Sequence, residues 1–162
     1  MNTIGWLVAV LVSAGTPKVG DIAPDFTAKD VEGRDISLSQ LASQGPVLLA
    51  FFPKAFTPGC TKQLSAYATE YAELRERNAQ VVAVSMDDLK TQKKFKESLG
   101  AGFIFIADPQ GKIVRLFDLR DQAQAKRAAF VIDRERRVLR VDLGDHAMDA
   151  TDKTIKSCET SG

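Results

Sequence analysis

The sequence predicts an α/β fold in which a central mixed sheet carries helices on both faces. Between residues 46 and 106, apolar runs of strand length alternate with amphipathic helical patterns, which is typical of parallel strands joined by helices. Two further strand patterns, at residues 128–132 and 137–141, are separated only by residues 133–136. Because so short a connection joins neighbouring antiparallel strands, the sheet should contain both strand directions.

The first elements after Gly15 are short. Residues 19–26 predict an irregular segment, because a glycine and a proline interrupt it. Residues 31–34 predict a turn, after which Ser37 or Ser39 caps a short helix. Residues 46–52 form a continuous apolar run, which predicts a central strand that is buried on both faces.

A long helix and a second buried strand follow. The helix is predicted from Pro58 to about Asn78, with charged side chains on its outer faces. Its apolar residues recur at helical spacing: Leu64, Tyr67, Ala68, Tyr71 and Leu74. Residues 80–85 are apolar and rich in valine, so they predict the second strand.

A basic amphipathic helix and a third strand come next. Asp87 or Asp88 caps this helix, which continues through Leu99 and ends at Gly100. Residues 103–106 are aromatic and β-branched, and they predict the third strand.

The carboxyl-terminal part predicts the hairpin and a last helix from near Asp145 toward Lys156. In the hairpin loop, residues 134–137 are charged and stand where a turn containing glycine is expected. This order of elements is what a thioredoxin-like fold requires. A flavodoxin-like, all-parallel sheet is the alternative, and it fits less well because residues 128–141 leave no room for a crossover helix.

Composition and charge exclude several classes of protein. The length of 162 residues fits one domain of ordinary size. Lys and Arg number 22 against 21 Asp and Glu, so the chain lacks the excess positive charge of a nucleic-acid binder. Its single histidine excludes a multi-histidine metal site, and its two cysteines cannot form a disulfide scaffold.

Cys60 is the candidate nucleophile. It follows the first buried strand, where sites of open α/β sheets lie. With Thr57 as the N-cap and Pro58 at the first helical position, Cys60 occupies the third. Unpaired backbone N–H groups and the positive end of the helix dipole would there favour the thiolate, which is the reactive form. The alternatives are a buried, inert cysteine and a threonine that only caps the helix.

The pattern Pro53-x-x-x-Thr57-x-x-Cys60 resembles the active-site motif of peroxiredoxins, and residues 52–61 as a whole resemble their Q-type, or bacterioferritin-comigratory-protein, branch. Residues 19–26 are similar to the amino-terminal segment of that family, and residues 127–133 to its late strand. The resemblance implies a thioredoxin-like fold. It also implies a thiol-dependent peroxidase that reduces hydrogen peroxide and organic hydroperoxides through a cysteine sulfenic acid, without a metal or an organic cofactor.

The resemblance implies a role for each matching residue. Cys60 is the peroxidatic cysteine, Thr57 hydrogen-bonds the peroxide, Arg127 holds the thiolate and the peroxide oxygens, and Pro53 shields the sulfur from water. Gln63 stands where the Q branch often has glutamate, on the same helix face as Cys60. The expected substrate-binding residues are Thr57, Gly59, Cys60, Gln63 and Arg127, with donors from the N–H groups near Gly59 and Cys60.

The chain departs from the family pattern at the resolving cysteine. Many Q-type members have a cysteine five residues after the peroxidatic one, and here that position is Ser65. Cys158, the other cysteine, is a candidate resolving residue or an incidental tail cysteine. We therefore expect a one-cysteine mechanism, in a monomer or homodimer, with an external reductant: a thioredoxin-like or glutaredoxin-like protein or a low-molecular-weight thiol.

Two other functions compete with the peroxidase. Thiol–disulfide exchange of the thioredoxin type needs a Cys-x-x-Cys motif, and the first position of that motif is Thr57 here. A redox-sensing, thioredoxin-like module without peroxidase turnover would use Cys60 as its sensor. Peroxide consumption distinguishes an enzyme from such a module.

Residues 4–12 form an uncharged apolar stretch, which is too short to span a bilayer comfortably. It matches the apolar part of a secretory signal, and residues 12–14 offer a cleavage site of small residues. We expect residues 1–14 to be a signal peptide or N-terminal anchor and residues 15–162 to be a single domain; an N-terminal strand is the alternative. A signal would place the protein in a bacterial cell envelope or periplasm. Without a signal, the protein would be cytoplasmic.

Overall fold

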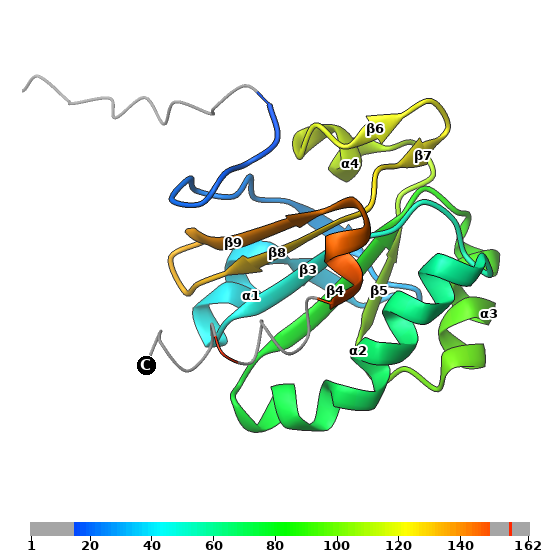
Figure 1. Ribbon diagram of the computed structural model, residues 1–162, viewed down its shortest axis with the longest axis horizontal. Coiled ribbons are helices and arrows are strands. Elements are labelled where there is room, and N and C mark those ends of the chain that lie inside the picture. Colours follow the sequence, from blue (N-terminus) through cyan, green and yellow to red (C-terminus); the bar gives the residue numbers. More distant parts are fainter. Residues whose placement is uncertain (1–14, 150–155, 157–162) are drawn as a thin grey trace, which may run out of the picture.

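A five-stranded sheet forms the centre of the protein (Figure 1). The structure, a computed structural model, describes residues 15–149 and Lys156. The strands follow the order β5 (Ile104–Ala107), β4 (Gln80–Ser85), β3 (Val47–Phe51), β8 (Ala128–Ile132) and β9 (Val138–Leu143). β3, β4 and β5 are parallel, whereas β8 and β9 run antiparallel to their neighbours. The sheet is therefore mixed, as the sequence predicts.

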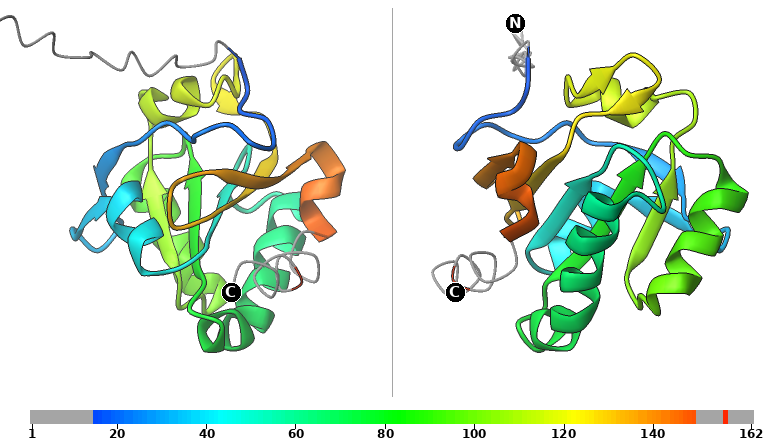
Figure 2. Two further views of the ribbon diagram at one scale, coloured as in Figure 1. Left: turned by 90° about the vertical axis from the view of Figure 1, so that its left-hand side faces the viewer. Right: turned by 45° about the vertical axis from the view of Figure 1, so that its right-hand side comes forward.

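Helices cover both faces of this sheet, which confirms the predicted layers (Figure 2). α1 (Leu38–Gln44) and α4 (Lys112–Leu116) pack on one face, and α2 (Pro58–Glu76) and α3 (Leu89–Leu99) on the other. Every residue of β3 is buried, because its side chains alternate between the two cores. Within residues 15–149, no helix is both long and apolar enough to cross a bilayer.

The ends of the predicted helices agree closely with the structure. α2 begins at Pro58, as expected, and ends two residues before Asn78. Asp88 is the N-cap of α3, since its carboxylate accepts a hydrogen bond of 2.7 Å from the Thr91 N–H. Gly100 ends that helix in the left-handed conformation, with φ of 59°.

The hairpin loop between β8 and β9 forms without glycine. Arg136 takes the left-handed position, with φ of 62°. The Asp133 carboxylate holds the loop, because it accepts hydrogen bonds from the backbone N–H groups of Glu135 and Arg137 at 2.9 and 2.8 Å. These bonds account for a tight turn at a charged sequence.

Several short elements are absent from the sequence prediction. They are α4 and two small hairpins, which consist of β1 (Thr27–Lys29), β2 (Asp35–Ser37), β6 (Arg120–Asp121) and β7 (Gln124–Ala125). Where the sequence predicts the start of a last helix, near Asp145, the structure has a 3₁₀ helix, η1 (Gly144–Asp149). The predicted signal segment and Cys158 lie outside the described residues.

Candidate active site

α2 follows the carboxyl end of the central strand β3 (Figure 1). Cys60 lies in the first turn of this helix. Thr57 occupies the N-cap with extended backbone angles, and Pro58 starts the helix. Proline is well suited to this position because it has no N–H to leave unpaired. Cys60 is fully buried among apolar side chains between α2 and the sheet. Its predicted place in the helix is therefore confirmed.

The Thr57 side chain does not cap the helix, although its position is that of an N-cap. Its hydroxyl donates instead to the Lys54 carbonyl at 2.7 Å, within the loop that precedes α2. The first N–H groups of α2 thus have no side-chain acceptor, and the Thr57 oxygen keeps lone pairs that can accept a hydrogen bond from a ligand. The alternative of a merely capping threonine does not agree with this geometry.

Strand pairing brings Arg127 to the helical turn that contains Cys60. In the β3–β8 ladder, Phe51 at the end of β3 pairs with Ala128 at the start of β8, so Arg127 comes to the loop before α2. Its guanidinium lies against the first turn of the helix: a Cβ placed on Gly59 would be 2.9 Å from its Nη2 atom. The Arg127 carbonyl accepts a hydrogen bond of 2.9 Å from the Gly144 N–H, which fixes the backbone. A permanent positive charge is thus held beside the cysteine's helical turn.

Gln63 is hydrogen-bonded to the Arg127 guanidinium. Its Oε1 atom accepts a hydrogen bond of 2.7 Å from Arg127 Nη1, and the side chain is fully buried. The structure thus brings Gln63 and Arg127 together, as two of the predicted site residues. Because the amide holds Arg127, its contact with substrate stays a prediction.

Tyr67 belongs to the same cluster and is missing from the predicted site. Gln63 Nε2 donates to its hydroxyl at 3.3 Å, and the hydroxyl donates to the Ala147 carbonyl at 2.7 Å. Burial raises the pKa of Tyr67, so the phenol stays protonated. In the sequence, Tyr67 only continues the apolar face of α2; its place four residues after Gln63 is the one available signal.

Asp87 anchors the loop that carries the site. Its Oδ2 atom accepts hydrogen bonds from the Ala55 N–H at 2.8 Å and from the Ser85 hydroxyl at 2.7 Å. Buried Gln92 supports Ser85, since its Nε2 atom donates to the serine Oγ at 2.8 Å. The sequence offers Asp87 and Asp88 as alternative helix caps, and only Asp88 caps α3.

Phe56 shows that this loop is strained. It takes a left-handed conformation, with φ of 64°, which is costly for a bulky residue. Its side chain is 54% exposed and packs on Phe95 of α3, with ring centroids 5.0 Å apart. The strain lies between the anchored Ala55 and the N-cap Thr57, so the surrounding contacts must hold the loop in place.

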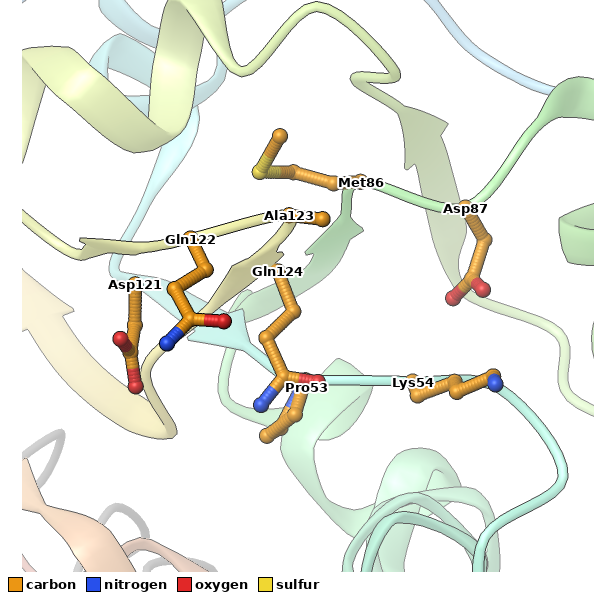
Figure 3. A pocket seen from close by; sticks show the side chains of 8 residues that line it. All are labelled: Pro53, Lys54, Met86, Asp87, Asp121, Gln122, Ala123 and Gln124. Carbon is orange, nitrogen blue, oxygen red and sulfur yellow. The ribbon is translucent and has the colours of Figure 1, made fainter.

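Pro53 lies two residues after the end of β3 and lines a cavity of about 390 Å³ (Figure 3). The cavity lies between the loops after β3 and β4 and the small β6–β7 hairpin, and its other lining residues are Lys54, Met86, Asp87, Asp121, Gln122, Ala123 and Gln124. Figure 3 shows Lys54 and Asp87 together on one side of it. Shielding of the Cys60 sulfur by Pro53 stays a prediction. Among the described residues, no group of His, Cys, Asp and Glu is arranged to hold a metal ion.

The comparisons with known proteins agree with this geometry. The sequence profile of the AhpC/TSA family matches residues 19–141. A Mycobacterium tuberculosis protein classed as a peroxiredoxin is 38% identical over 147 residues, which is 85% of this chain and 94% of that protein. A chloroplastic peroxiredoxin Q of Oryza sativa subsp. japonica is 35% identical over 102 residues, which is 63% of this chain and 46% of that protein.

A solved structure is similar as well. The crystal structure of the peroxidoxin BcpB of Mycobacterium tuberculosis has a TM-score of 0.83 at 36% identity, and the match covers 88% of this chain and 97% of that one. This likeness confirms the thioredoxin-like α/β fold, and the relatives confirm the resemblance to Q-type peroxiredoxins. The chain therefore belongs to the AhpC/TSA family, the thiol-dependent peroxidases known as peroxiredoxins.

Proposed function

We propose that this peroxiredoxin reduces hydrogen peroxide and organic hydroperoxides at Cys60 by a one-cysteine mechanism, with an external thiol as reductant. The observation that supports this best is the position of Arg127, which lies against Gly59 in the helical turn that contains Cys60. A fixed cation and unpaired backbone N–H groups thus lie at the helical turn that carries the nucleophile. This is the environment in which a thiolate attacks a peroxide bond.

The oxidation step uses these groups in turn. The Cys60 thiolate attacks the terminal oxygen of the hydroperoxide, an S–O bond forms, and the O–O bond breaks. The bonding pair leaves with the distal oxygen as hydroxide or alkoxide, which takes a proton from water. The attacked oxygen keeps its hydrogen and becomes the sulfenic acid, Cys60–SOH.

Arg127 and Thr57 orient the peroxide. The guanidinium stabilises the negative charge that develops on the leaving oxygen, because it is in place before the reaction begins. The Thr57 hydroxyl donates to the Lys54 carbonyl, so it can only accept. It therefore accepts the hydrogen of the attacked oxygen, which turns the peroxide toward the sulfur.

An external thiol completes the cycle. It attacks Cys60–SOH to form a mixed disulfide and release water, and a second thiol then restores Cys60 and leaves as the disulfide. Ser65, at the position where a resolving cysteine is expected, lies half-buried on α2 and offers no sulfur. The reductant is a thioredoxin-like or glutaredoxin-like protein or a small thiol. The enzyme itself is a monomer or a homodimer.

Rapid-mixing kinetics test this function. With an equimolar amount of peroxide, the wild type should form a sulfenic acid that a dimedone-type probe labels at Cys60. Cys60→Ser should consume no peroxide, and Cys158→Ser should behave as the wild type. A stoichiometric Cys60–Cys158 disulfide would contradict the one-cysteine mechanism, and oxidation without turnover by any thiol would instead indicate a redox sensor.

We also propose that residues 1–14 direct the protein to a bacterial cell envelope or periplasm. The uncharged apolar stretch at residues 4–12 supports this. Cell fractionation with amino-terminal sequencing tests it: an exported chain that begins near Gly15 is expected, and a cytoplasmic chain that keeps residues 1–14 would contradict it.

A further inference from the structure

We propose that Tyr67 is a positioning residue of the peroxidase reaction, because it orients the amide of Gln63, which in turn holds Arg127. This role rests on the proposed function of Cys60 and Arg127. It follows from the direction of three linked hydrogen bonds, which run from Arg127 through Gln63 and Tyr67 to the Ala147 carbonyl.

The direction of these bonds is set at their far end. The one hydrogen of the Tyr67 hydroxyl goes to the Ala147 carbonyl at 2.7 Å, so the phenol oxygen can only accept from its other neighbour. Gln63 must therefore turn its NH₂ group toward Tyr67, at 3.3 Å. Its Oε1 atom then points the other way and accepts from Arg127 Nη1 at 2.7 Å.

The opposite orientation of the amide is excluded by its contacts. It would place the NH₂ group of Gln63 against the guanidinium of Arg127, with a donor facing a donor. It would also place Oε1 against the Tyr67 oxygen, with an acceptor facing an acceptor. Gln63 and Tyr67 are fully buried, so water is not at hand to relieve either clash. Burial also raises the pKa of Tyr67, which keeps the hydroxyl hydrogen in place over the neutral range.

The 3₁₀ helix η1 holds both the backbone and the guanidinium of Arg127. η1 packs beside α2 (Figure 1), and its Ala147 carbonyl ends the chain of side-chain hydrogen bonds. The Gly144 N–H of the same segment donates to the Arg127 carbonyl. The backbone of Arg127 is thus held directly by η1, and its guanidinium is held through Tyr67 and Gln63.

A Gln63→Glu variant supplies the decisive comparison. A carboxylate accepts from Arg127 with either oxygen, so it needs no partner to choose its orientation. If Tyr67 acts by orienting an amide, its hydroxyl should matter in the wild type, which has that amide, and become dispensable in the Gln63→Glu variant. A hydroxyl that only stabilises the fold should matter equally in both.

The experiment measures the second-order rate of Cys60 oxidation by hydrogen peroxide in a double-mutant cycle. Tyr67→Phe should slow oxidation about tenfold, less than the roughly hundredfold or greater loss when a whole charge-stabilising donor is removed. In the Gln63→Glu background, the same substitution should change the rate less than about twofold. Tyr71→Phe is the matched control on the same helix. The Tyr71 hydroxyl accepts a hydrogen bond from Arg75, farther along α2 and away from the turn of Cys60. The oxidation rate of this variant should equal that of the wild type.

Thermal unfolding separates positioning from folding. Tyr67→Phe leaves the Ala147 carbonyl without its donor in the wild-type background, so the melting temperature should fall there. In the Gln63→Glu background the one hydroxyl hydrogen has two acceptors, the carboxylate and the Ala147 carbonyl, so the fall in melting temperature reports the loss of either bond and is measured beside the rate. An equal loss of rate in the two backgrounds, or no loss in either, would overturn the proposal. If peroxide does not oxidise wild-type Cys60 at all, the proposed function fails before the variants are compared.

Discussion

The missing side chain of Gly59 decides where Arg127 can lie. A Cβ at this position would be 2.9 Å from the guanidinium, closer than such contacts allow. Since the contact is with the end of a side chain, the guanidinium can move away without a shift of the backbone, but its hydrogen bond to Gln63 is then weakened. Gly59 is therefore needed to let the Arg127 guanidinium approach the helix. The helix itself does not need it, because glycine is unfavourable there.

Gly59→Ala should separate activity from stability. We expect the rate of Cys60 oxidation to fall about tenfold, since a displacement near 1 Å can cost up to about a hundredfold. The free energy of unfolding should stay within about 1 kcal/mol of wild type, because the preference of alanine for the helix offsets the weakened hydrogen bond between Arg127 and Gln63. Peroxide kinetics and urea unfolding measure the two effects, and an unchanged rate would contradict the close contact with Arg127.

Arg127→Ala should slow peroxide reduction about a hundredfold or more, because it removes the charge that stabilises the leaving oxygen. The neighbouring Lys126 is exposed, so Lys126→Ala is the matched control and should leave the rate unchanged. Competition with a second peroxidase measures both rates. A folded Arg127→Ala protein with wild-type kinetics would remove Arg127 from the mechanism.

At the scale of elements, two neighbouring aspartates connect loops and helices in different ways. Asp87 ties the loop before α2 to the end of β4, through Ala55 and Ser85. Asp88 only caps α3, and its hydrogen bond from the Thr91 N–H lowers its pKa. The pair therefore provides a variant and its control at adjacent positions.

Asp87→Ala should slow Cys60 oxidation about tenfold, because the strained loop that carries Thr57 loses its anchor. It should also destabilise the fold by about 1–3 kcal/mol, the cost of an unpaired buried donor. Asp88→Ala should lower the stability of the fold because α3 loses its cap, with no change in rate. Equal kinetics of the two variants would show that Asp87 does not hold the site.

How far the elements can be predicted depends on their length. β3, β4, α2 and α3 carry long apolar patterns, so their places follow from the sequence alone. β6 and β7 have two residues each and α4 has five, which is too short for any periodicity to be detected. Their structure is set by the parts of the chain against which they pack.

Some residues of the site can be predicted from the sequence and others cannot. Cys60 and Thr57 are recognisable because helix-start residues and the nucleophile are neighbours in sequence, and Arg127 because its segment resembles a family motif. Tyr67 is not recognisable, since its acceptor Ala147 is 80 residues away. Asp87 looks like a helix cap in the sequence, because an aspartate between a strand and a helix can either cap the helix or anchor a loop. The loop residue that it anchors, Ala55, is 32 residues away.

For the whole molecule, Asp30 links stability to pH. Its burial by itself would raise its pKa, but hydrogen bonds from the Arg34 and Glu32 N–H groups and from the Arg34 guanidinium outweigh this and hold the pKa below its usual value. A carboxyl with a lowered folded pKa stabilises the protein above its unfolded pKa of about 3.9, and this contribution is lost as pH falls through the folded pKa.

Asp30→Asn should therefore lower the free energy of unfolding at neutral pH, and the difference from wild type should shrink as the pH falls below about 4. Urea unfolding at a series of pH values measures this. Asp35→Asn is the control, because Asp35 forms an exposed ion pair with Lys29. A difference that stays constant with pH would exclude Asp30 as a source of acid sensitivity.

The pairing of Phe51 with Ala128 also decides where this chain tolerates an extra residue. An insertion in the loop between β8 and β9 lies at the end of β8 remote from Arg127, next to the irregular pairing at Val131 and Ile132, so it leaves the guanidinium in place. An insertion that slips β8 by one residue against β3 would instead turn every side chain of β8 to the opposite face and move Arg127 from the helical turn. We therefore expect this chain to accept an added residue in the loop between β8 and β9 and to lose the placement of Arg127 when the residue is added before β8.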